Sequence, residues 1–365
     1  TNRGKYPHFM LKEIHEQPDV VAHTLLGRVA DDAVDLSREL AWTPEEAAQW
    51  KRIHFVACGT SHYATIVAQH IMEPFGNFEI RTEVASEYRY RNIPSGPDTL
   101  AVFVSQSGET ADTLHAARLA KARGAKCLVI TNVRGSTIHR EVGDALITPA
   151  GPEIGVAATK TFTAQITILT LLGLYLAKLR GELDQNTERR LVSALMDIPG
   201  KQAAMLDREK EIETLARNFA DARGFFFIGR GIDYAISLEG SLKLKEISYI
   251  HSEAYAAGEL KHGTISLIEE GTLVVGLATQ TELYEKTVSN LVECKSRGAY
   301  LMGLTCGNYG IEDTVDFAVY VPRTDPLFAA SLAVVPLQLL SYYVAVGKGL
   351  DVDKPRNLAK SVTVE

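Results

Sequence analysis

The sequence predicts an α/β protein with two tandem, doubly wound parallel-sheet subdomains and a C-terminal tail. The chain of 365 residues is too long for one ordinary domain and suits two. Short β-rich apolar runs alternate with helical stretches, which is the pattern of βαβ units. Similar runs and loops also recur roughly 170 residues apart, which indicates an internal repeat.

The repeat is visible in two pairs of strand-like runs. Gly59 and Gly229 each end an apolar run, and they lie 229 − 59 = 170 residues apart. Leu100 and Leu273 each begin a run that leads into a polar loop and a helix, with a spacing of 273 − 100 = 173. One loop insertion accounts for the difference of three residues, so we expect the two copies to share one fold.

Strand positions and domain limits follow from the same pattern. The strands of the first copy are expected near residues 52–58, 79–84, 98–104, 125–131 and 144–148. These runs are continuously apolar rather than alternating, as in parallel strands that helices cover on both faces. The expected organisation is a helical lead-in at residues 1–40, a first subdomain at 41–200, a second at 201–349 and a tail at 350–365.

Composition narrows the class of partner. The net charge is −7 and the isoelectric point about 5.9, so no basic stripe is available for nucleic acid. The most apolar stretches, residues 162–179 and 327–346, carry Thr, Ser, Gln or Pro and are predicted as buried helices rather than membrane spans. The four cysteines lie far apart without metal-type spacing, which favours a cytoplasmic chain with free thiols, and the net charge does not exclude a small anionic substrate.

One polar loop has the composition of a phosphate site. In open α/β sheets, ligands bind outside the carboxyl ends of the strands. Residues 58–61 (CGTS) and 105–110 (SQSGET) follow two such ends, and the second loop opens a predicted helix. Hydroxyls and backbone N–H groups at a helix N-terminus suit a phosphate dianion. Helix capping is the competing reading, but residues 278–282 of the second copy lack this composition, which favours an anion site.

A charged stretch in the second copy carries the candidate acid–base groups. In a helix near residues 236–250, Glu239, Lys243 and Glu246 fall on one face at i, i+4 and i+7. An exposed ladder of ion pairs is one reading. The other is a buried carboxylate beside a cation, which suits proton transfer. Two further candidates are His262, which lies near a turn, and Lys360, which lies in the tail. For each there is a non-catalytic alternative: a structural turn histidine and a solvated lysine.

The phosphate loop resembles that of a known family. The sequences at residues 105–110 and 58–61 resemble the SIS (sugar isomerase) domain family, in which a phosphosugar binds these loops. The resemblance implies two SIS-type, flavodoxin-like subdomains. It also implies that the substrate phosphate contacts Thr60, Ser61, Ser105, Gln106, Ser107 and Thr110.

The rest of the chain resembles a narrower family. GELKHG at residues 258–263, the tail PRNLAKSVTVE and EIGVA at residues 153–157 are similar to glucosamine-6-phosphate synthases, the isomerizing glutamine:fructose-6-phosphate aminotransferases. The similarity covers essentially the whole chain and corresponds to the isomerase domain. One departure is Ala158, where that family often has Ser, and we expect weaker substrate binding from it.

This resemblance implies residue roles. Glu246 would move a proton from C1 to C2 of the sugar, and Lys243 would steady the negative charge of the enol-type intermediate. His262, reaching from the neighbouring subunit, would open the fructose ring, and Lys360 would engage the C2 carbonyl. The sugar pocket would be lined by Val156, Glu239 and Ala359.

The implied reaction converts fructose-6-phosphate and ammonia into glucosamine-6-phosphate, the first step of hexosamine biosynthesis. No role calls for a metal or an organic cofactor. The ammonia would come from a glutaminase domain outside this chain, and the chain would form a homodimer. Two alternatives remain: a related SIS phosphosugar isomerase or deglycase, which would not need Lys360, and a non-catalytic phosphosugar-sensing domain, which would not need Glu246.

Overall fold

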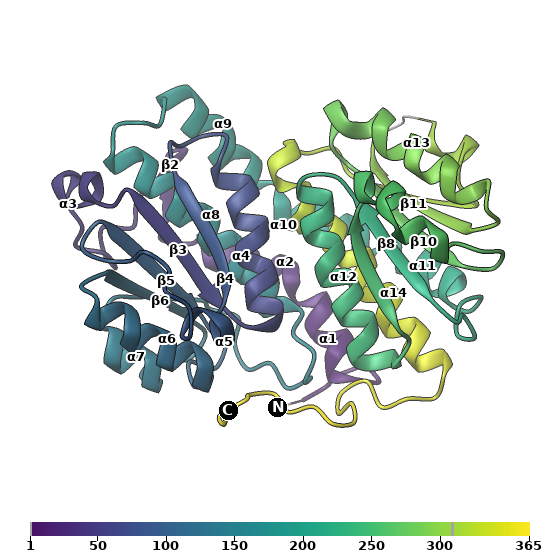
Figure 1. The fold of residues 1–365 in the computed structure, drawn as a ribbon, viewed down its shortest axis with the longest axis horizontal. Coiled ribbons are helices and arrows are strands. Elements are labelled where there is room, and N and C mark those ends of the chain that lie inside the picture. The colour runs from purple at the N-terminus through teal and green to yellow at the C-terminus, as the bar shows by residue number, and fades with distance from the viewer. Residues whose placement is uncertain (1, 308–309) are drawn as a thin grey trace. The chain divides into compact units, whose positions relative to one another are not determined.

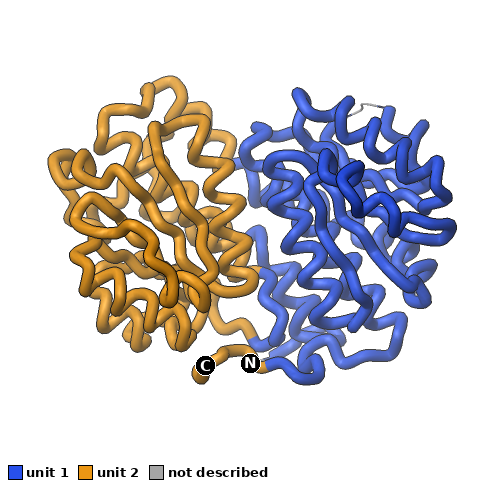
Figure 2. Tube along the Cα trace, in the orientation of Figure 1, with its two compact units in different colours: residues 1–18, 154–159, 197–358 blue, residues 19–153, 160–196, 359–365 orange. Residues whose placement is uncertain are grey.

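The computed structural model describes residues 2–307 and 310–365, so residue 1 of the lead-in and residues 308–309 of the second subdomain lie outside the described part. The chain forms two compact units (Figure 2). Unit 1 comprises residues 1–18, 154–159 and 197–358, and unit 2 comprises residues 19–153, 160–196 and 359–365. Each unit is built around one five-stranded sheet.

Unit 2 contains the first of the two sheets. Its strands are β3 (Arg52–Ala57), β4 (Glu79–Val84), β5 (Thr99–Val104), β6 (Lys126–Thr131) and β7 (Ala145–Ile147). They are all parallel and lie in the order β4-β3-β5-β6-β7. Every residue of β5 is buried, as expected for a central strand covered on both faces. The helices are α3 (Pro44–Gln49), α4 (Gly59–Met72), α5 (Ala85–Tyr88), α6 (Ala111–Ala122), α7 (Thr137–Val142), α8 (Lys160–Leu179) and α9 (Gln185–Met196).

Unit 1 contains the second sheet. Its parallel strands are β8 (Phe225–Gly229), β9 (Ser252–Ala256), β10 (Leu273–Ala278), β11 (Tyr300–Cys306) and β12 (Phe317–Val321), in the order β12-β11-β10-β8-β9. Figure 1 labels β8, β10 and β11 of this sheet. The α-helices of unit 1 include α10 (Ile198–Leu206), α11 (Glu209–Ala216), α12 (Ile232–Ser248), α13 (Tyr284–Lys295) and α14 (Ala329–Gly347). Short 3-10 helices are η1 (Ala257–His262), η2 (Thr264–Leu267), η3 (Thr281–Leu283), η4 (Ile311–Asp313) and η5 (Pro326–Phe328).

The two sheets share one topology. Numbered within each unit, both have the order 2-1-3-4-5, which is the flavodoxin-like order, so the predicted fold class is confirmed. The helix after the first strand begins at Gly59 in unit 2 and at Ile232 in unit 1, and 232 − 59 = 173. The pairing of Gly59 with Gly229 was therefore wrong by three residues, and no loop insertion is needed to explain the repeat at this point.

The lead-in combines helices with a short hairpin. Helices α1 (Phe9–His15) and α2 (Gln17–Leu25) come first, and the antiparallel strands β1 (Val29–Ala30) and β2 (Ala33–Val34) follow. Asp31 and Asp32 form the two-residue turn between them and both have positive φ, as such tight hairpins require. The tail beyond α14 contains no helix or strand within the described residues.

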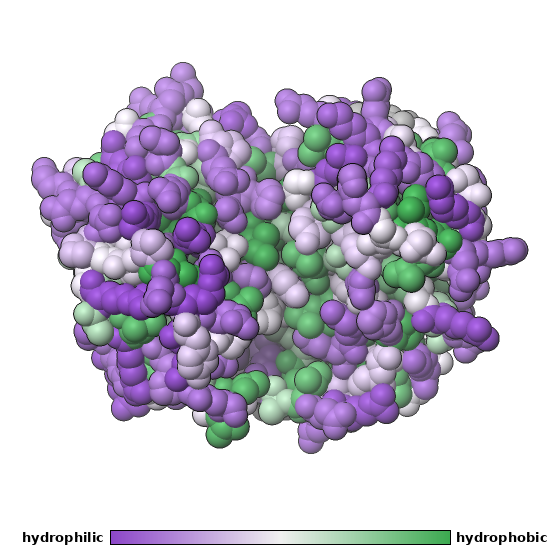
Figure 3. All heavy atoms as spheres, in the orientation of Figure 1, coloured by the Kyte–Doolittle hydropathy of each residue, from purple (hydrophilic) through white to green (hydrophobic). Residues whose placement is uncertain are grey.

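The two longest apolar helices lie inside the protein. Residues 160–179 and 326–347 are long and apolar enough to cross a membrane by length and composition, but in each the apolar stretch of 18 residues is 89% buried. Figure 3 shows a largely hydrophilic surface on the face in view. The two helices are therefore core elements, as the polar residues within them predicted.

Candidate functional site

The loop at residues 105–110 in unit 2 is held in shape by its own hydroxyl groups. The Ser105 and Thr110 hydroxyl oxygens lie 2.9 Å apart, and Ser105 Oγ also accepts the Gly108 N–H at 3.0 Å. Ser107 Oγ accepts the Glu109 N–H at 3.1 Å. Hydroxyls that already accept a backbone N–H are oriented in advance, so the loop presents a preformed polar surface rather than a set of mobile side chains.

Gly108 is required at the tip of this loop. Its φ is +69°, a conformation that favours glycine, and a Cβ there would lie 2.0 Å from Ser136 Oγ. The backbone is also tied to the next strand, because Gln106 O accepts the Asn132 N–H at 3.1 Å. The loop therefore packs closely against the segment after β6.

Glu109 supports the loop through hydrogen bonds to the start of α7. Its carboxylate accepts the Thr137 hydroxyl and the Thr137 N–H, at 2.5 and 2.8 Å. The hydrogen bond from the Thr137 hydroxyl, followed by the one from the backbone, lowers the pKa of Glu109. An ionised carboxylate fixes the start of α7 beside the loop, a role that the sequence analysis did not assign.

The capping alternative is not supported for Thr110. Thr110 occupies the N-cap position of α6 but its side chain makes no capping hydrogen bond. The first N–H of that helix, from Ala111, donates instead to Val362 O of the tail at 3.1 Å. Thr60 and Ser61 lie in the first turn of α4, after Gly59 with φ of +57°.

The tail brings Lys360 to the same unit as the loop. Ser361 donates to Ser107 Oγ at 3.1 Å, and the Glu365 carboxylate pairs with Arg89. Lys360 Nζ pairs with Glu153, and 26% of the lysine side chain remains exposed. Ala359, which precedes it, is exposed. The alternative reading of Lys360 as a solvated tail lysine is therefore not supported, because a carboxylate holds its ammonium group.

Glu153, part of the motif at residues 153–157, is the carboxylate that pairs with Lys360. Its side chain is fully buried and accepts the Thr161 N–H at 3.1 Å and the Thr161 hydroxyl at 2.9 Å. These two donors hold the carboxylate in one orientation at the start of α8, facing Lys360. The only signal in the sequence was an acidic residue at a position of the kind that is usually buried. Spacing alone does not show that such a position is buried.

In unit 1, helix α12 places Glu239, Lys243 and Glu246 together. Lys243 Nζ lies 3.1 Å from Glu239 Oε1 and 3.3 Å from Glu246 Oε2. The side chains of Glu239 and Lys243 are fully buried, while Glu246 is 18% exposed. The reading of these residues as an exposed ladder of ion pairs is therefore wrong.

The electrostatics of this cluster keep Lys243 charged. Burial by itself lowers the pKa of Lys243, but the nearby charges of Glu239 and Glu246 outweigh burial and raise it above the ordinary value. One buried cation shared by two carboxylates is a fixed positive charge, and Glu246 is the partner that reaches the surface. This arrangement can hold a developing negative charge beside a carboxylate that accepts protons.

The other two predicted residues of unit 1 lie on separate segments. His262 ends η1 and is exposed. The Val156 N–H donates to Asp353 O at 3.2 Å, which ties the segment at residues 154–159 to the start of the tail. Each unit thus holds part of the predicted set.

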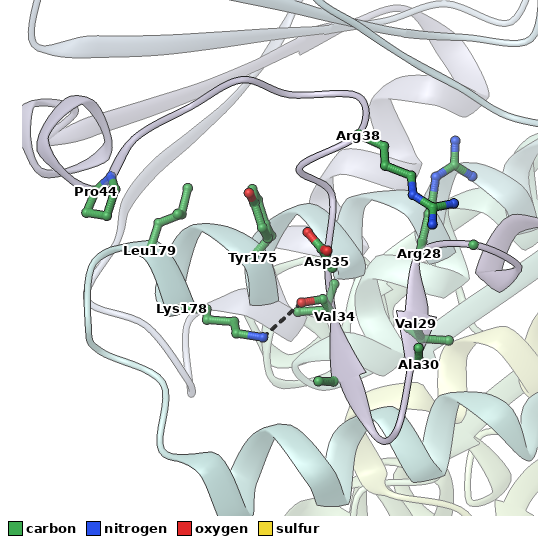
Figure 4. A pocket seen from close by; sticks show the side chains of 12 residues that line it. Arg28, Val29, Ala30, Val34, Asp35, Arg38, Pro44, Tyr175, Lys178 and Leu179 are labelled. Atoms are coloured by element: carbon green, nitrogen blue, oxygen red, sulfur yellow. Dashed lines mark hydrogen bonds between the residues drawn. The ribbon is translucent and has the colours of Figure 1, made fainter.

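Unit 2 also has a hollow of about 530 Å³ that none of the predicted residues lines (Figure 4). The β1–β2 hairpin and the end of α8 border it. Two cations that line it already have partners: the buried Arg28 pairs with Glu39 at 2.8 Å, and the exposed Lys178 donates to Val34 O at 3.0 Å.

Comparisons with known proteins identify the family of the chain. The SIS domain family matches residues 46–175 and 218–347. A glutamine–fructose-6-phosphate aminotransferase (isomerizing) of Clostridium tetani is 49% identical over 100% of this chain and 60% of its own length, and one of Symbiobacterium thermophilum is 50% identical with the same coverage. The chain thus spans about 60% of the length of these curated relatives.

Two solved structures extend the comparison. The C-terminal domain of the glucosamine-fructose-6-phosphate aminotransferase of Francisella tularensis is 39% identical, with a TM-score of 0.92, and the match covers 97% of this chain and 100% of that one. A glucosamine-6-phosphate deaminase of Thermotoga maritima is 25% identical with a TM-score of 0.75, over 97% of this chain and 99% of that one.

Proposed function

The chain belongs to the SIS domain family, and we propose that it acts as the isomerase part of a glutamine–fructose-6-phosphate aminotransferase. The proposed reaction converts fructose-6-phosphate and ammonia into glucosamine-6-phosphate and water. The observation that carries the proposal is the buried Glu239–Lys243 pair with the partly exposed Glu246 beside it. This group has the chemistry that an aldose–ketose interconversion needs.

The loop at residues 105–110 is proposed to hold the phosphate. Hydroxyls of Ser105, Ser107 and Thr110, together with Gln106, would donate to its oxygens, and Thr60 and Ser61 would complete the set from α4. Anchoring the phosphate supplies binding energy away from the reacting carbons and orients C1 and C2. Val156, Ala359 and Glu239 are proposed to line the sugar.

Each chemical step has a proposed carrier. His262 exchanges protons with the ring oxygen and the C2 hydroxyl to open the ring, since imidazole is suited to acid–base work near neutral pH. The Lys360 amine adds to the C2 carbonyl and releases water, giving an imine that ammonia displaces to regenerate the lysine. Glu246 then takes the proton from C1 and returns it to C2, while the Lys243 cation stabilises the charge that builds up between these steps.

The partners belong to the same proposal. Ammonia is proposed to come from a glutaminase domain of the whole enzyme, and the enzyme to be a cytoplasmic homodimer. His262 is exposed within this chain, which is compatible with a role in the site of a neighbouring subunit. No metal or organic cofactor takes part in the proposed steps.

The test is a coupled assay with fructose-6-phosphate, with and without ammonium, on the wild type and on Glu246→Gln. The wild type should form glucose-6-phosphate without ammonium and glucosamine-6-phosphate with it. In Glu246→Gln the rates of forming both products should fall by about 100-fold or more, because proton transfer is removed. The variant should still bind sugar phosphate. Glu285→Gln, an exposed position of the same unit, is the matched control and should be unaffected.

A related phosphosugar isomerase or deaminase is the second candidate, because the Thermotoga maritima deaminase shares the fold and 25% of the sequence. Lys360→Ala separates the two. The aminotransferase proposal requires loss of glucosamine-6-phosphate formation, whereas a plain isomerase would keep its activity. Binding without turnover by the wild type would favour a sensing domain.

A further inference from the structure

The loop after β10 in unit 1 has the same topological position as the phosphate loop of unit 2. Strands β5 and β10 are each third in the order 2-1-3-4-5, and each leads through a polar loop into a helix. Ser105 is the first residue after β5, and Thr279 is the first residue after β10. Two loops of one topology sit at the edge where open α/β sheets bind ligands.

A carboxylate of the same chain already fills the loop in unit 1. The Thr279 N–H donates to Asp233 Oδ2 at 2.8 Å, and the Thr279 hydroxyl donates to Oδ1 at 2.5 Å. The Gln280 N–H also donates to this carboxylate. Two successive backbone N–H groups and a hydroxyl converging on one anion are the donor set that proteins use for phosphate and carboxylate ligands.

The carboxylate is held deep in the unit. Asp233 is 2% exposed and Thr279 is 3% exposed. Gly229 permits this closeness, because a Cβ at that position would lie 2.7 Å from the Asp233 carbonyl carbon. The first turn of α12 therefore packs directly on the end of β8, and the Asp233 side chain points to the neighbouring strand end.

The position of Asp233 identifies what it replaces. Asp233 is the second residue of α12, and Thr60 is the second residue of α4, the corresponding helix of unit 2. Thr60 is one of the residues assigned to the substrate phosphate. Where unit 2 offers a neutral hydroxyl, unit 1 therefore has a negatively charged carboxylate at the end of a longer side chain.

We propose that the loop after β10 is an anion-binding loop occupied by the chain's own Asp233, which excludes a phosphate ester from unit 1. The comparison with unit 2 rests on the proposed function, because that function identifies residues 105–110 as the phosphate site. A second anion cannot enter beside a buried carboxylate that uses the same donors, since like charges at this range repel strongly. The duplicated fold then has one phosphosugar site per chain.

The test uses tungstate, a tetrahedral oxyanion with a strong anomalous signal, soaked into crystals of the full chain. The wild type should bind it at residues 105–110 and not at Thr279. Asp233→Thr, which copies the residue of α4, and Asp233→Ser should each add a second anion at Thr279. An ordered loop without tungstate in both variants, or an anion at Thr279 in the wild type, would overturn the proposal.

The reverse exchange covers the case in which changes at Asp233 prevent folding. Thr60→Asp should place a carboxylate in the loop of unit 2 and remove tungstate from residues 105–110, whereas Thr60→Asn should retain it. Tungstate bound at residues 105–110 in Thr60→Asp contradicts the proposal. Absence of tungstate there in the wild type would instead count against the proposed function, while the result at Thr279 would still be read separately.

Discussion

Among single residues, Lys243 is under a strong electrostatic constraint. Its ammonium is fully buried between a buried and a partly exposed carboxylate. Transfer of these charges from water costs several kcal/mol each, and mutual attraction offsets that cost only while both partners are present. The cluster of Glu239, Lys243 and Glu246 therefore indicates a role in chemistry more than a contribution to stability.

Lys243→Met is expected to destabilise the protein by about 3–5 kcal/mol, because it leaves the buried Glu239 charge without its cation. Lys245→Met, on the exposed face of the same helix, is the matched control and should cost less than about 1 kcal/mol. Urea unfolding of both variants measures the difference. Equal urea midpoints for the two variants would mean that the buried Glu239–Lys243 pair contributes nothing to the free energy of unfolding.

Asp233 gives a prediction on pH. Burial raises its pKa to about 6, even though the hydrogen bonds from Thr279 and Gln280 act in the opposite direction. The folded pKa lies above the unfolded one of 3.8, so the stability that this carboxyl contributes is full below pH 3.8 and is lost as the pH rises through about 6.

The measurement compares the wild type with Asp233→Asn, which has the same shape and no titration. The free energy of unfolding of the wild type relative to the variant should fall by an amount of the order of 3 kcal/mol between pH 4 and pH 7. A difference that stays constant over this range would contradict the raised pKa.

Among the structural elements, the loop at residues 105–110 depends on close packing. Gly108→Ala would force a Cβ against Ser136 and a side chain into a left-handed conformation. We expect kcat/KM for fructose-6-phosphate to fall on the order of 100-fold through displaced phosphate ligands. Gly135→Ala is the control: Gly135 also has a positive φ, but a Cβ added there would have no atom within 4 Å. This variant therefore tests the backbone strain alone and should leave the Michaelis constant unchanged.

The tail is the second element with a testable link to the site. Glu153→Gln weakens the pairing that fixes Lys360, so we expect kcat to fall while sugar-phosphate binding is retained. Cleavage by trypsin after Lys360 should also become faster, which a change confined to the chemistry would not cause. Glu153→Asp, which keeps the charge, should recover part of the activity. Unchanged proteolysis and unchanged kcat would remove Glu153 from this role.

For the whole molecule, we expect two inactive variants to complement each other, because His262 of one subunit is proposed to act in the site of the other. His262→Asn and Glu246→Gln should each be inactive alone. Mixed after unfolding and refolding, half of the dimers would be hybrids, and each hybrid would have one intact site, so about a quarter of the wild-type activity should return. No recovery would place both residues in one subunit's site. Light scattering on the same samples reports whether the chain is dimeric.

The candidate site was only partly predictable from the sequence. The composition SQSGET could be recognised because hydroxyls, Gly and a helix start lie next to one another in the chain. The burial of Glu239 and Lys243 could not be inferred, because the spacing i, i+4 is the same in an exposed ladder. Glu153 was missed for a similar reason: its contact with Lys360 joins residues more than two hundred positions apart.

Apolar runs and repeated motifs along the chain predicted the α/β class and the duplication, because such patterns are local properties of a sequence, whereas the flavodoxin-like sheets were implied by the resemblance to the SIS family. Tertiary structure decided the register of the repeat, in which Asp233 rather than a residue near Gly229 occupies the place of Thr60. It also decided which charges are buried and which loop is already filled. Burial and charge pairing are set by packing between distant segments, and only the folded chain brings those segments together.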